Sequence, residues 1–329
     1  MTLWQTPSWQ EMLLASWQSE EYFVIEQDIQ SSKSSESEHK TKIFVEKRRV
    51  SLGEYGLFVI GSEGQIDARI EENLQELCAE EKCMFVQIET LNYFTAAPSL
   101  IGHNWESCCV KNKENWWEGY KFQVWKYYKK FIPVFTAVID LTKSKQEILS
   151  CMKAKGRYNI RLAEKKWVEV REAEKNDENI KLFYNLMQET TSRDGFAWNT
   201  LWYYKIFLEQ ETSHLFFAYH SWEVLSAGIF ISHWEVMYYY YGASSSQKRN
   251  LMAPYLLQWH AITFAKDRWC TFYDFLGIAS PDEKNSPLTG VTDFKLKLTS
   301  DSREVSQSYV YIHKVWKYRL IQILKYITK

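Results

Sequence analysis

Basic residues gather in one short stretch of the sequence, from Met152 to Val170. Its lysines and arginines fall within fourteen residues, and Glu164 is the only acid among them. Apolar residues supply one side, so the pattern predicts a basic amphipathic helix that leads into a strand. A patch of this kind can bind a polyanion. A solvated helix face would give the same pattern.

Two further residues could take part in phosphate binding or acyl transfer. Arg193 stands at the end of a predicted helix, where a guanidinium can bind a phosphate through two hydrogen bonds. An ion pair with the adjacent Asp194 is an equal alternative. Lys295 follows Phe294 near the end of the chain. A lysine that lines a cleft can stabilise the oxyanion of an acyl transfer, although most single lysines have no such role.

Four consecutive tyrosines occupy a predicted strand at residues 238–241. Because alternate residues of a strand face the same way, Tyr239 and Tyr241 are expected to form one pair. Tyr238 and Tyr240 form the other. We expect one pair to face a cleft and the other to pack in the core.

Several kinds of chemistry have no support in the sequence. It holds no Ser-His-Asp set, zinc motif, Walker loop or G-x-G-x-x-G. The loop SSSQKRNLMAP at 244–254 lacks the glycines that let a backbone approach a pyrophosphate, which argues against coenzyme A. The six cysteines form no C-x-x-C pair and no metal spacing, so they are expected to be reduced thiols. No metal and no cofactor is predicted.

The composition is that of a globular protein with two domains. The chain has 329 residues, 46% of them hydrophobic and 25% charged, and its net charge is −1. No run of eighteen apolar residues occurs, and the start does not read as a secretory signal. We therefore expect a cytoplasmic, non-spanning protein.

The predicted elements indicate an α/β (α+β) fold that is repeated twice. In the second half, two helices precede three antiparallel strands, a helix and a further strand, which is the order of the acetyltransferase-like (GNAT) fold. The first half shows a shorter version. We predict a first domain over 1–139 and a second over 140–307, each with a mixed central sheet flanked by helices. The basic amphipathic helix at the end of the chain, within 308–329, is expected to dock on the first domain, with contact to a membrane surface as the alternative.

These residues together resemble the Fem family of peptidoglycan bridge-forming aminoacyltransferases. The resemblance rests on KGRYNIRLAEKK at 155–166, RDGF at 193–196, YYYYGASS at 238–245, RNLMAPYLLQWHAI at 249–262, YDFLGIA at 273–279 and GVTDFK at 290–295. The opening LWQTPSWQEM is similar too. Some members insert a long antiparallel helical arm, for which residues 171–215 leave no room. The sequence resembles the compact, FemX-like form.

The resemblance implies transfer of an amino acid from aminoacyl-tRNA, the co-substrate, to the stem-peptide amine of a muramyl-peptide. The acceptor would be UDP-linked or lipid-linked, and the protein would be a monomer in the cytoplasm or at the inner face of the membrane. Phe294 and Lys295 would form the transfer centre. The residues expected to bind the muramyl-peptide are Arg193, Tyr239, Tyr241 and Lys47. Those expected to contact tRNA phosphates are Lys153, Lys155, Arg157 and Arg161.

Two alternatives stay open at this point. One is a GNAT-like N-acyltransferase with another acyl donor, which a glycine-bearing pyrophosphate loop would have favoured. The other is a non-catalytic protein that binds tRNA or the cell-wall precursor, which would keep the basic stretch and tolerate the loss of Lys295.

Tryptophan is unusually common in this chain and glycine unusually rare, with 15 and 12 residues. Several tryptophans stand where a turn or a helix end favours glycine. We hypothesise that one codon, read here as tryptophan, is read as glycine in the source organism. The alternative is a tryptophan-rich protein with unusual turns. The positions concerned are Trp17, Trp125, Trp167, Trp198, Trp222, Trp234 and Trp269.

Overall fold

The computed structural model describes residues 1–28, 40–63, 66–93, 128–283, 286–306 and 308–327. The chain divides into two compact units, each described here by itself. Unit 1 comprises Met1–Val134 and Val305–Lys329, and unit 2 comprises Phe135–Glu304. The limits expected from the sequence were 139/140 and 307/308. The strand over 135–140 belongs to unit 2, where it pairs with two other strands of that unit.

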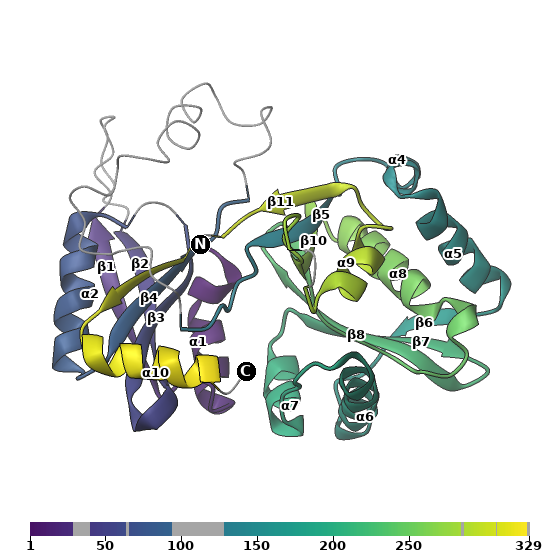
Figure 1. Ribbon diagram of the computed structural model, residues 1–329. Helices are drawn as coiled ribbons and strands as arrows, with labels where there is room; N and C mark the ends of the chain where they lie inside the picture. The colour runs from purple at the N-terminus through teal and green to yellow at the C-terminus, as the bar shows by residue number, and fades with distance from the viewer. Residues whose placement is uncertain (29–39, 64–65, 94–127, 284–285, 307, 328–329) are drawn as a thin grey trace, which may run out of the picture. The chain divides into compact units, whose positions relative to one another are not determined.

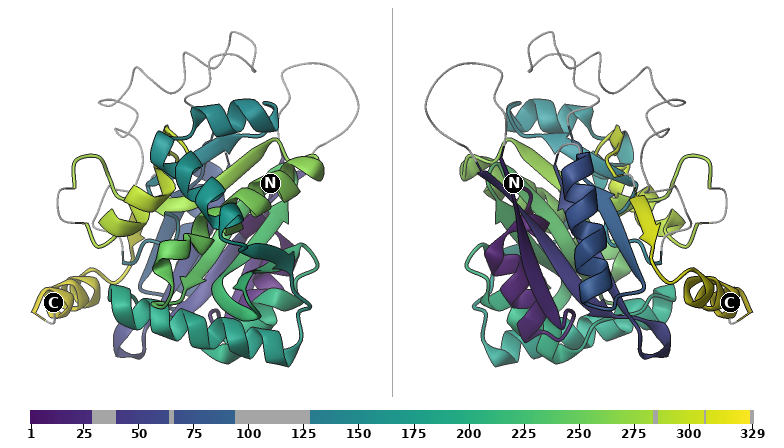
Figure 2. Two further views of the ribbon diagram at one scale, coloured as in Figure 1. Left: turned by 90° about the vertical axis from the view of Figure 1, so that its right-hand side faces the viewer. Right: turned by 90° about the vertical axis from the view of Figure 1, so that its left-hand side faces the viewer.

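Unit 1 is built on a five-stranded mixed sheet of order β1-β2-β3-β4-β12. Its strands are β1 (Glu21–Asp28), β2 (Lys40–Arg49), β3 (Tyr55–Ser62), β4 (Phe85–Thr90) and β12 (Ser308–Ile312). Only β3 and β4 pair in parallel. The helix α2 (Ala68–Glu80) covers one face, and α1 (Pro7–Ala15) and α10 (Val315–Ile327) lie on the other (Figures 1 and 2).

Unit 2 is built on a seven-stranded mixed sheet of order β11-β5-β10-β9-β8-β7-β6. Its strands are β5 (Phe135–Asp140), β6 (Glu169–Glu172), β7 (Ser213–His220), β8 (Glu223–His233), β9 (Val236–Ser244), β10 (Phe272–Ile278) and β11 (Asp301–Glu304). Its helices are α4 (Lys145–Cys151), α5 (Ala154–Lys165), α6 (Asp177–Asp194), α7 (Leu201–Glu209), α8 (Ala253–Asp267) and α9 (Thr289–Lys295). Helices α6 and α7 lie on one face, and α5, α8 and α9 on the other (Figure 1).

Local sequence signals set where these helices begin. Thr6 caps α1 by accepting from the backbone N–H of Trp9, with Pro7 at the first helical position. Ser144 and Glu147 form a capping box at the start of α4. The packing of helices on sheets is stabilised by burial of apolar side chains. In unit 1, α2 and the strands facing it enclose an apolar core. In unit 2, a larger core lies between the sheet and α5, α8 and α9.

The predicted α/β fold with two mixed sheets flanked by helices is confirmed. Residues 171–215 hold the end of β6, α6, α7 and the start of β7, with six residues between the two helices. A long helical arm is absent from this fully described segment, as predicted. Residues 308–312 pair with β4 in unit 1, which places the end of the chain on the first sheet.

Candidate active site

Lys295 is a buried lysine at the last residue of α9. Its Nζ donates hydrogen bonds to the backbone carbonyls of Gly277 at 2.7 Å and Leu276 at 3.2 Å. Burial lowers the pKa of this amine to about 7, and the charge of Asp274 opposes part of that shift. Because an ammonium has three N–H donors, one is left beyond the two carbonyls for a ligand.

An irregularity in β10 presents these two carbonyls. The pairing of β10 with β5 shifts register between Asp274 and Gly277, and Leu276 has a φ of 55°. The buried Asp274 accepts hydrogen bonds from the hydroxyl of Thr136 and, at 2.7 Å, from the N–H of Leu276. Bulges are common beside active sites, where they re-aim groups. Sequence reasoning missed Asp274 and the bulge, because only the pairing with a distant strand reveals them.

Aromatic side chains lie beside Lys295. Its Nζ is 5.9 Å from the ring centroid of Tyr239. Phe294 packs edge-on against Tyr255, with 5.0 Å between ring centroids. Burial raises the pKa of the Tyr239 hydroxyl, which stays protonated at neutral pH. The sequence-predicted residues Lys295, Phe294 and Tyr239 therefore come together on the face of the sheet that α8 and α9 cover.

Tyr241 lies on the opposite face, so the pairing of Tyr239 with Tyr241 expected from alternation is wrong. The register of β8 with β9 shifts at this point and leaves Tyr240 as an extra residue. An extra residue reverses the side to which the following residues point. The hydroxyl of Tyr241 lies 2.9 Å from that of Tyr203 in α7, away from Lys295.

Arg193 lies in the last turn of α6 and forms hydrogen bonds with the end of β9. Its guanidinium forms two hydrogen bonds with Asp194, Nε to Oδ1 at 2.8 Å and Nη2 to Oδ2 at 3.0 Å. Nη1 donates to the carbonyl of Ser244 at 3.0 Å. The hydrogen bond from Asp194 raises the pKa of Arg193. A phosphate at this position would have to compete with Asp194.

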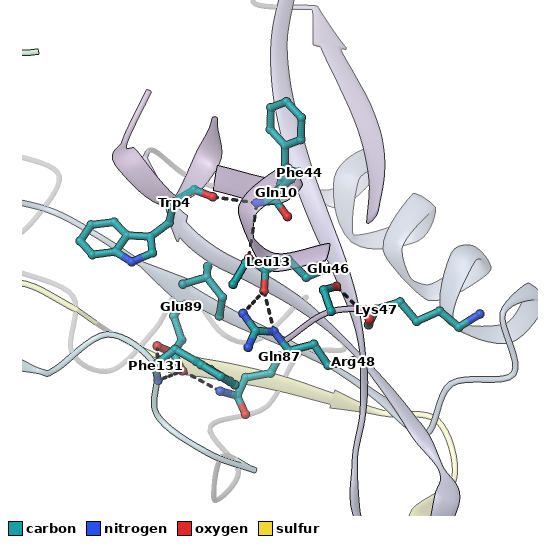
Figure 3. Close-up of polar contacts among 12 residues, drawn as sticks. Trp4, Gln10, Leu13, Phe44, Glu46, Lys47, Arg48, Gln87, Glu89 and Phe131 are labelled. Atoms are coloured by element: carbon teal, nitrogen blue, oxygen red, sulfur yellow. Dashed lines mark hydrogen bonds and ion pairs between the residues drawn. The ribbon is translucent and has the colours of Figure 1, made fainter. Parts of the chain in front are cut away.

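In unit 1, two neighbouring cations of β2 point to opposite faces of the sheet. Lys47 turns toward the end of α2, where its Nζ lies 2.5 Å from Glu81 and 3.8 Å from Glu21. Arg48 forms an ion pair with the fully buried Glu46, with 2.6 Å between Nη2 and Oε2 (Figure 3). Both cations have acidic partners, and sequence reasoning did not single out Arg48 or Glu46.

A second buried acid, Glu89 in β4, was also missed by sequence reasoning. It accepts hydrogen bonds from the backbone N–H groups of Phe131 and Ile132, and from the side-chain amide of Gln87 (Figure 3). Burial raises the pKa of Glu89 to about 7, although these hydrogen bonds oppose the shift. Glu89 thus holds residues 131 and 132 against β4, and Gln87 bonds to the backbone of Tyr128 and Lys129.

The four residues predicted to contact tRNA, in α5 and at its N-cap, divide into two groups. Lys153, Lys155 and Arg161 are exposed. Arg157 instead donates to the carbonyls of Ser150, in the last turn of α4, and of Met152, its C-cap residue. Three of the four residues predicted to contact tRNA are therefore presented to solvent, and the fourth ties two helices together.

Gly156 allows α5 to lie very close to the turn that follows α9. A Cβ at this position would be 2.1 Å from the carbonyl oxygen of Lys297. The same carbonyl accepts a hydrogen bond from the N–H of Lys153 at 3.1 Å. The glycine of the KGRYNIR string thus joins α5 to the chain just beyond Lys295.

Neither a metal site nor a membrane span is found in the described part of the chain. No group of three or more histidine, cysteine or acidic side chains there could hold a metal ion. None of the described helices has the length and apolar character needed to cross a membrane.

The model of the FemAB family matches this sequence over residues 1–222 and 209–326. The chain belongs to the FemAB family. The resemblance found in the sequence motifs is thereby confirmed, because the match covers nearly the whole chain and includes α5, β9, β10 and α9.

Two relatives within this family have names that state an activity. The lipid II:glycine glycyltransferase of Staphylococcus saprophyticus is 23% identical over an alignment of 258 residues, and the match covers 59% of this chain and 62% of that protein. The aminoacyltransferase FemB of Staphylococcus epidermidis is 31% identical over 101 residues, 30% of this chain and 24% of that protein. In both, the match spans less than two thirds of the relative.

Solved structures support the FemAB-family fold. A crystal structure of FemX has a TM-score of 0.70 at 17% identity and covers 97% of this chain and 94% of its own. The C-terminal domain of a putative lysylphosphatidylglycerol synthetase from Agrobacterium fabrum has a TM-score of 0.54 at 9% identity, covering 85% of this chain and 84% of its own. The predicted pair of GNAT-like domains in a FemX-like form agrees with the first of these.

Proposed function

We propose that this chain is an aminoacyltransferase of peptidoglycan bridge formation that uses aminoacyl-tRNA as donor. The observation that carries the proposal is the buried Lys295, held by two carbonyls of the β10 bulge with a donor left over. A preorganised cation in a site poor in water is suited to an oxyanion. The names of the two staphylococcal relatives support the same class of reaction.

The proposed reaction needs no covalent enzyme intermediate. The acceptor amine attacks the ester carbonyl carbon of aminoacyl-tRNA, a C–N bond forms, and the carbonyl oxygen becomes an oxyanion beside Lys295. The bond to the ribose oxygen then breaks, and the proton lost by the amine ends on the released ribose hydroxyl. Because the ester is already activated, positioning and charge stabilisation supply most of what is required.

For the donor, we propose that the exposed basic residues of α5 contact tRNA phosphates. Lys153 is the N-cap residue of α5 and makes no side-chain capping hydrogen bond, and Lys155 lies in the first turn. Positive charge at a helix N-terminus opposes the helix dipole. A phosphate bound there would offset this repulsion.

For the acceptor, Arg193 and Tyr239 remain our proposed contacts in unit 2. Lys47 and Tyr241 were predicted to have the same role. In the structure Lys47 is paired with Glu81, and Tyr241 is bonded to Tyr203. Each would have to exchange its partner to bind a substrate.

We propose that the acceptor is lipid-linked and that α10 brings unit 1 to the membrane surface. One face of α10 packs on unit 1 through Tyr318 and Ile321. The outward face is apolar and exposed at Trp316, Leu320, Ile323 and Ile327. Lys314 and Lys317 pair with Glu54 beside it. An apolar stripe with flanking cations is typical of helices that lie in a lipid interface.

The test is a transfer assay with charged tRNA and either a UDP-muramyl-pentapeptide or its lipid-linked form. We expect an aminoacylated muramyl-peptide, with a higher rate on the lipid-linked acceptor. Lys295→Met should lower kcat by roughly 10²–10³-fold, the usual effect of removing one oxyanion donor, while tRNA binding is unchanged.

Other outcomes would favour the alternatives. Transfer from acetyl coenzyme A but not from charged tRNA would support an N-acyltransferase with another donor. Binding of tRNA or precursor without any transfer, unaltered in Lys295→Met, would support a non-catalytic binding protein. Either result would refute the proposed function.

A further inference from the structure

Five tryptophans have a backbone conformation that favours glycine. Their φ angles are positive, at 59° for Trp17, 60° for Trp167, 73° for Trp222, 51° for Trp234 and 66° for Trp269. Their side chains are between 79% and 91% exposed, so burial of the indole rings does not explain the conformation. Bulky residues at positive φ are genuine outliers. Five of the eleven non-glycine residues with positive φ in the described chain are tryptophans, which points to a common cause.

Three of the five close helices in the same way. Trp17, Trp167 and Trp269 each follow the C-cap residue of α1, α5 and α8, respectively. In each case the tryptophan N–H bonds to the carbonyl three residues back, and the next N–H bonds to the carbonyl five residues back. This double hydrogen bond is the Schellman motif, whose left-handed position is usually glycine.

Within the same chain, Gly195 ends α6 with a φ of 75°. It shows glycine in the corresponding left-handed position. Lys82 occupies such a position after α2, with a φ of 53°, so a side chain there is tolerated. At the ends of α1, α5 and α8, the residue with left-handed backbone conformation is nevertheless tryptophan each time, the bulkiest residue.

The other two tryptophans occupy two-residue hairpin turns. Ser221 and Trp222 join β7 to β8 and both have positive φ, which is the pattern of a type I′ turn. Such turns strongly favour glycine at the second position. Between β8 and β9, the first turn residue Trp234 alone has positive φ. That is the pattern of a type II′ turn, which has glycine first.

None of the remaining described tryptophans has positive φ. Trp4 and Trp9 are buried in unit 1, and Trp259 lies inside α8. Trp198 does not have positive φ, so the structure gives no reason for glycine there. Trp125 lies outside the described residues. The structure therefore narrows the seven positions suspected from composition to five.

We infer that residues 17, 167, 222, 234 and 269 are glycine in the protein that the source organism makes. One codon, distinct from the codon for Trp4, Trp9 and Trp259, is translated as glycine there and appears as tryptophan in the printed sequence. Adding five to the 12 glycines gives 17, closer to the usual proportion. A set of exposed tryptophan anchors for a partner is the competing explanation, but it does not account for φ. The inference is independent of the proposed function.

The first test compares the coding triplets. We expect one triplet at the five positions and a different one at Trp4, Trp9 and Trp259. The same triplet in both groups would refute the inference. Peptide mass spectrometry of the protein purified from the source organism then gives the residue directly. Glycine at 167, 222 and 269 is expected, and tryptophan at those positions would overturn the inference.

A second test measures the melting temperature of recombinant variants, to show whether tryptophan strains the backbone at these five positions. One variant replaces all five tryptophans by glycine, and so includes Trp167→Gly and Trp222→Gly. Its Tm should rise by roughly 2–4 °C for each kcal/mol of backbone strain removed. The matched control changes the same five residues to alanine, which removes the ring and keeps a Cβ at positive φ. Equal gains in both variants, or a lower Tm in the glycine variant, would contradict the inference.

Discussion

Lys295 is the residue whose protonation should limit the rate of transfer. Because burial lowers its pKa to about 7, the ammonium form is lost as the pH rises through that value. If the ammonium stabilises the oxyanion, kcat falls on the alkaline side of its pH profile. Lys295→Arg keeps a positive charge at every accessible pH and should remove this alkaline limb. An alkaline limb that persists unchanged in Lys295→Met would assign it to another group.

Lys295 should also change how the free energy of unfolding depends on pH. Its pKa is about 7 in the folded protein and near its ordinary value of about 10.4 when unfolded. Between these values the unfolded chain binds the extra proton, so the free energy of unfolding rises with pH. Lys295→Met should lose this rise. Denaturation curves of both proteins at pH 7 and pH 10 measure the difference, and parallel pH dependence would show that the lysine is not buried in solution.

At the level of single residues, the sequence indicated which side chains could take part in the chemistry, but not always the face of the sheet on which each one lies. Lys295, Phe294 and Tyr239 could be named from motifs, and they lie together. Tyr241 could not be placed, because a bulge at Tyr240 reverses the alternation and depends on the pairing of β8 with β9. Local sequence carries no signal for such a register shift.

At the level of elements, the contact between α5 and the turn after α9 depends on Gly156. Its replacement by alanine would place a Cβ 2.1 Å from the carbonyl oxygen of Lys297. We expect Gly156→Ala to destabilise the protein by about 1–3 kcal/mol and to lower kcat, since Lys297 lies two residues from Lys295. Chemical denaturation and the transfer assay measure the two effects.

Gly290 in α9 is a matched control for this substitution. A Cβ there would meet nothing within 4 Å. Gly290→Ala should therefore be neutral or should stabilise α9 by roughly 0.5–1 kcal/mol, as alanine does in helices. A loss of stability as large as that of Gly156→Ala would mean that the close approach is not the cause.

The charges of α5 should act on tRNA affinity rather than on stability. Lys155→Gln and Arg161→Gln each remove an exposed cation. If that cation binds a tRNA phosphate, its removal should reduce the slope of log affinity against log salt by about 0.7–0.9. Lys181→Gln, an exposed lysine of α6, is the control and should leave the slope unchanged. Arg157→Gln should lower stability instead, because Arg157 binds the carbonyls that end α4.

At the level of the whole molecule, the two repeats of strands and helices could be predicted because their periodicities are local. The position of the last strand could be predicted less well. Residues 308–312 join β4 across more than two hundred residues of sequence, and only the amphipathic helix after them indicated docking. Buried acids such as Glu46 and Glu89 were not predicted. Glu46 pairs with Arg48 on its own strand, but strand alternation does not show that this face is buried. Glu89 accepts from the backbone N–H groups of Phe131 and Ile132, more than forty residues along the chain.

The outward apolar face of α10 is proposed to bind the membrane that holds the lipid-linked acceptor. Trp316, Ile323 and Ile327 are 56–71% exposed, so changing Trp316 and Ile323 to glutamate should not disturb the face that packs on unit 1. We expect the variant to lose binding to vesicles that contain anionic lipid and to keep its activity on a UDP-linked acceptor. Leu182→Glu, at an exposed apolar residue of α6, is the matched control. Vesicle binding that survives the change in α10 would place the membrane contact elsewhere, whereas an equal loss of activity on both acceptors would show that α10 supports the fold and not the membrane contact.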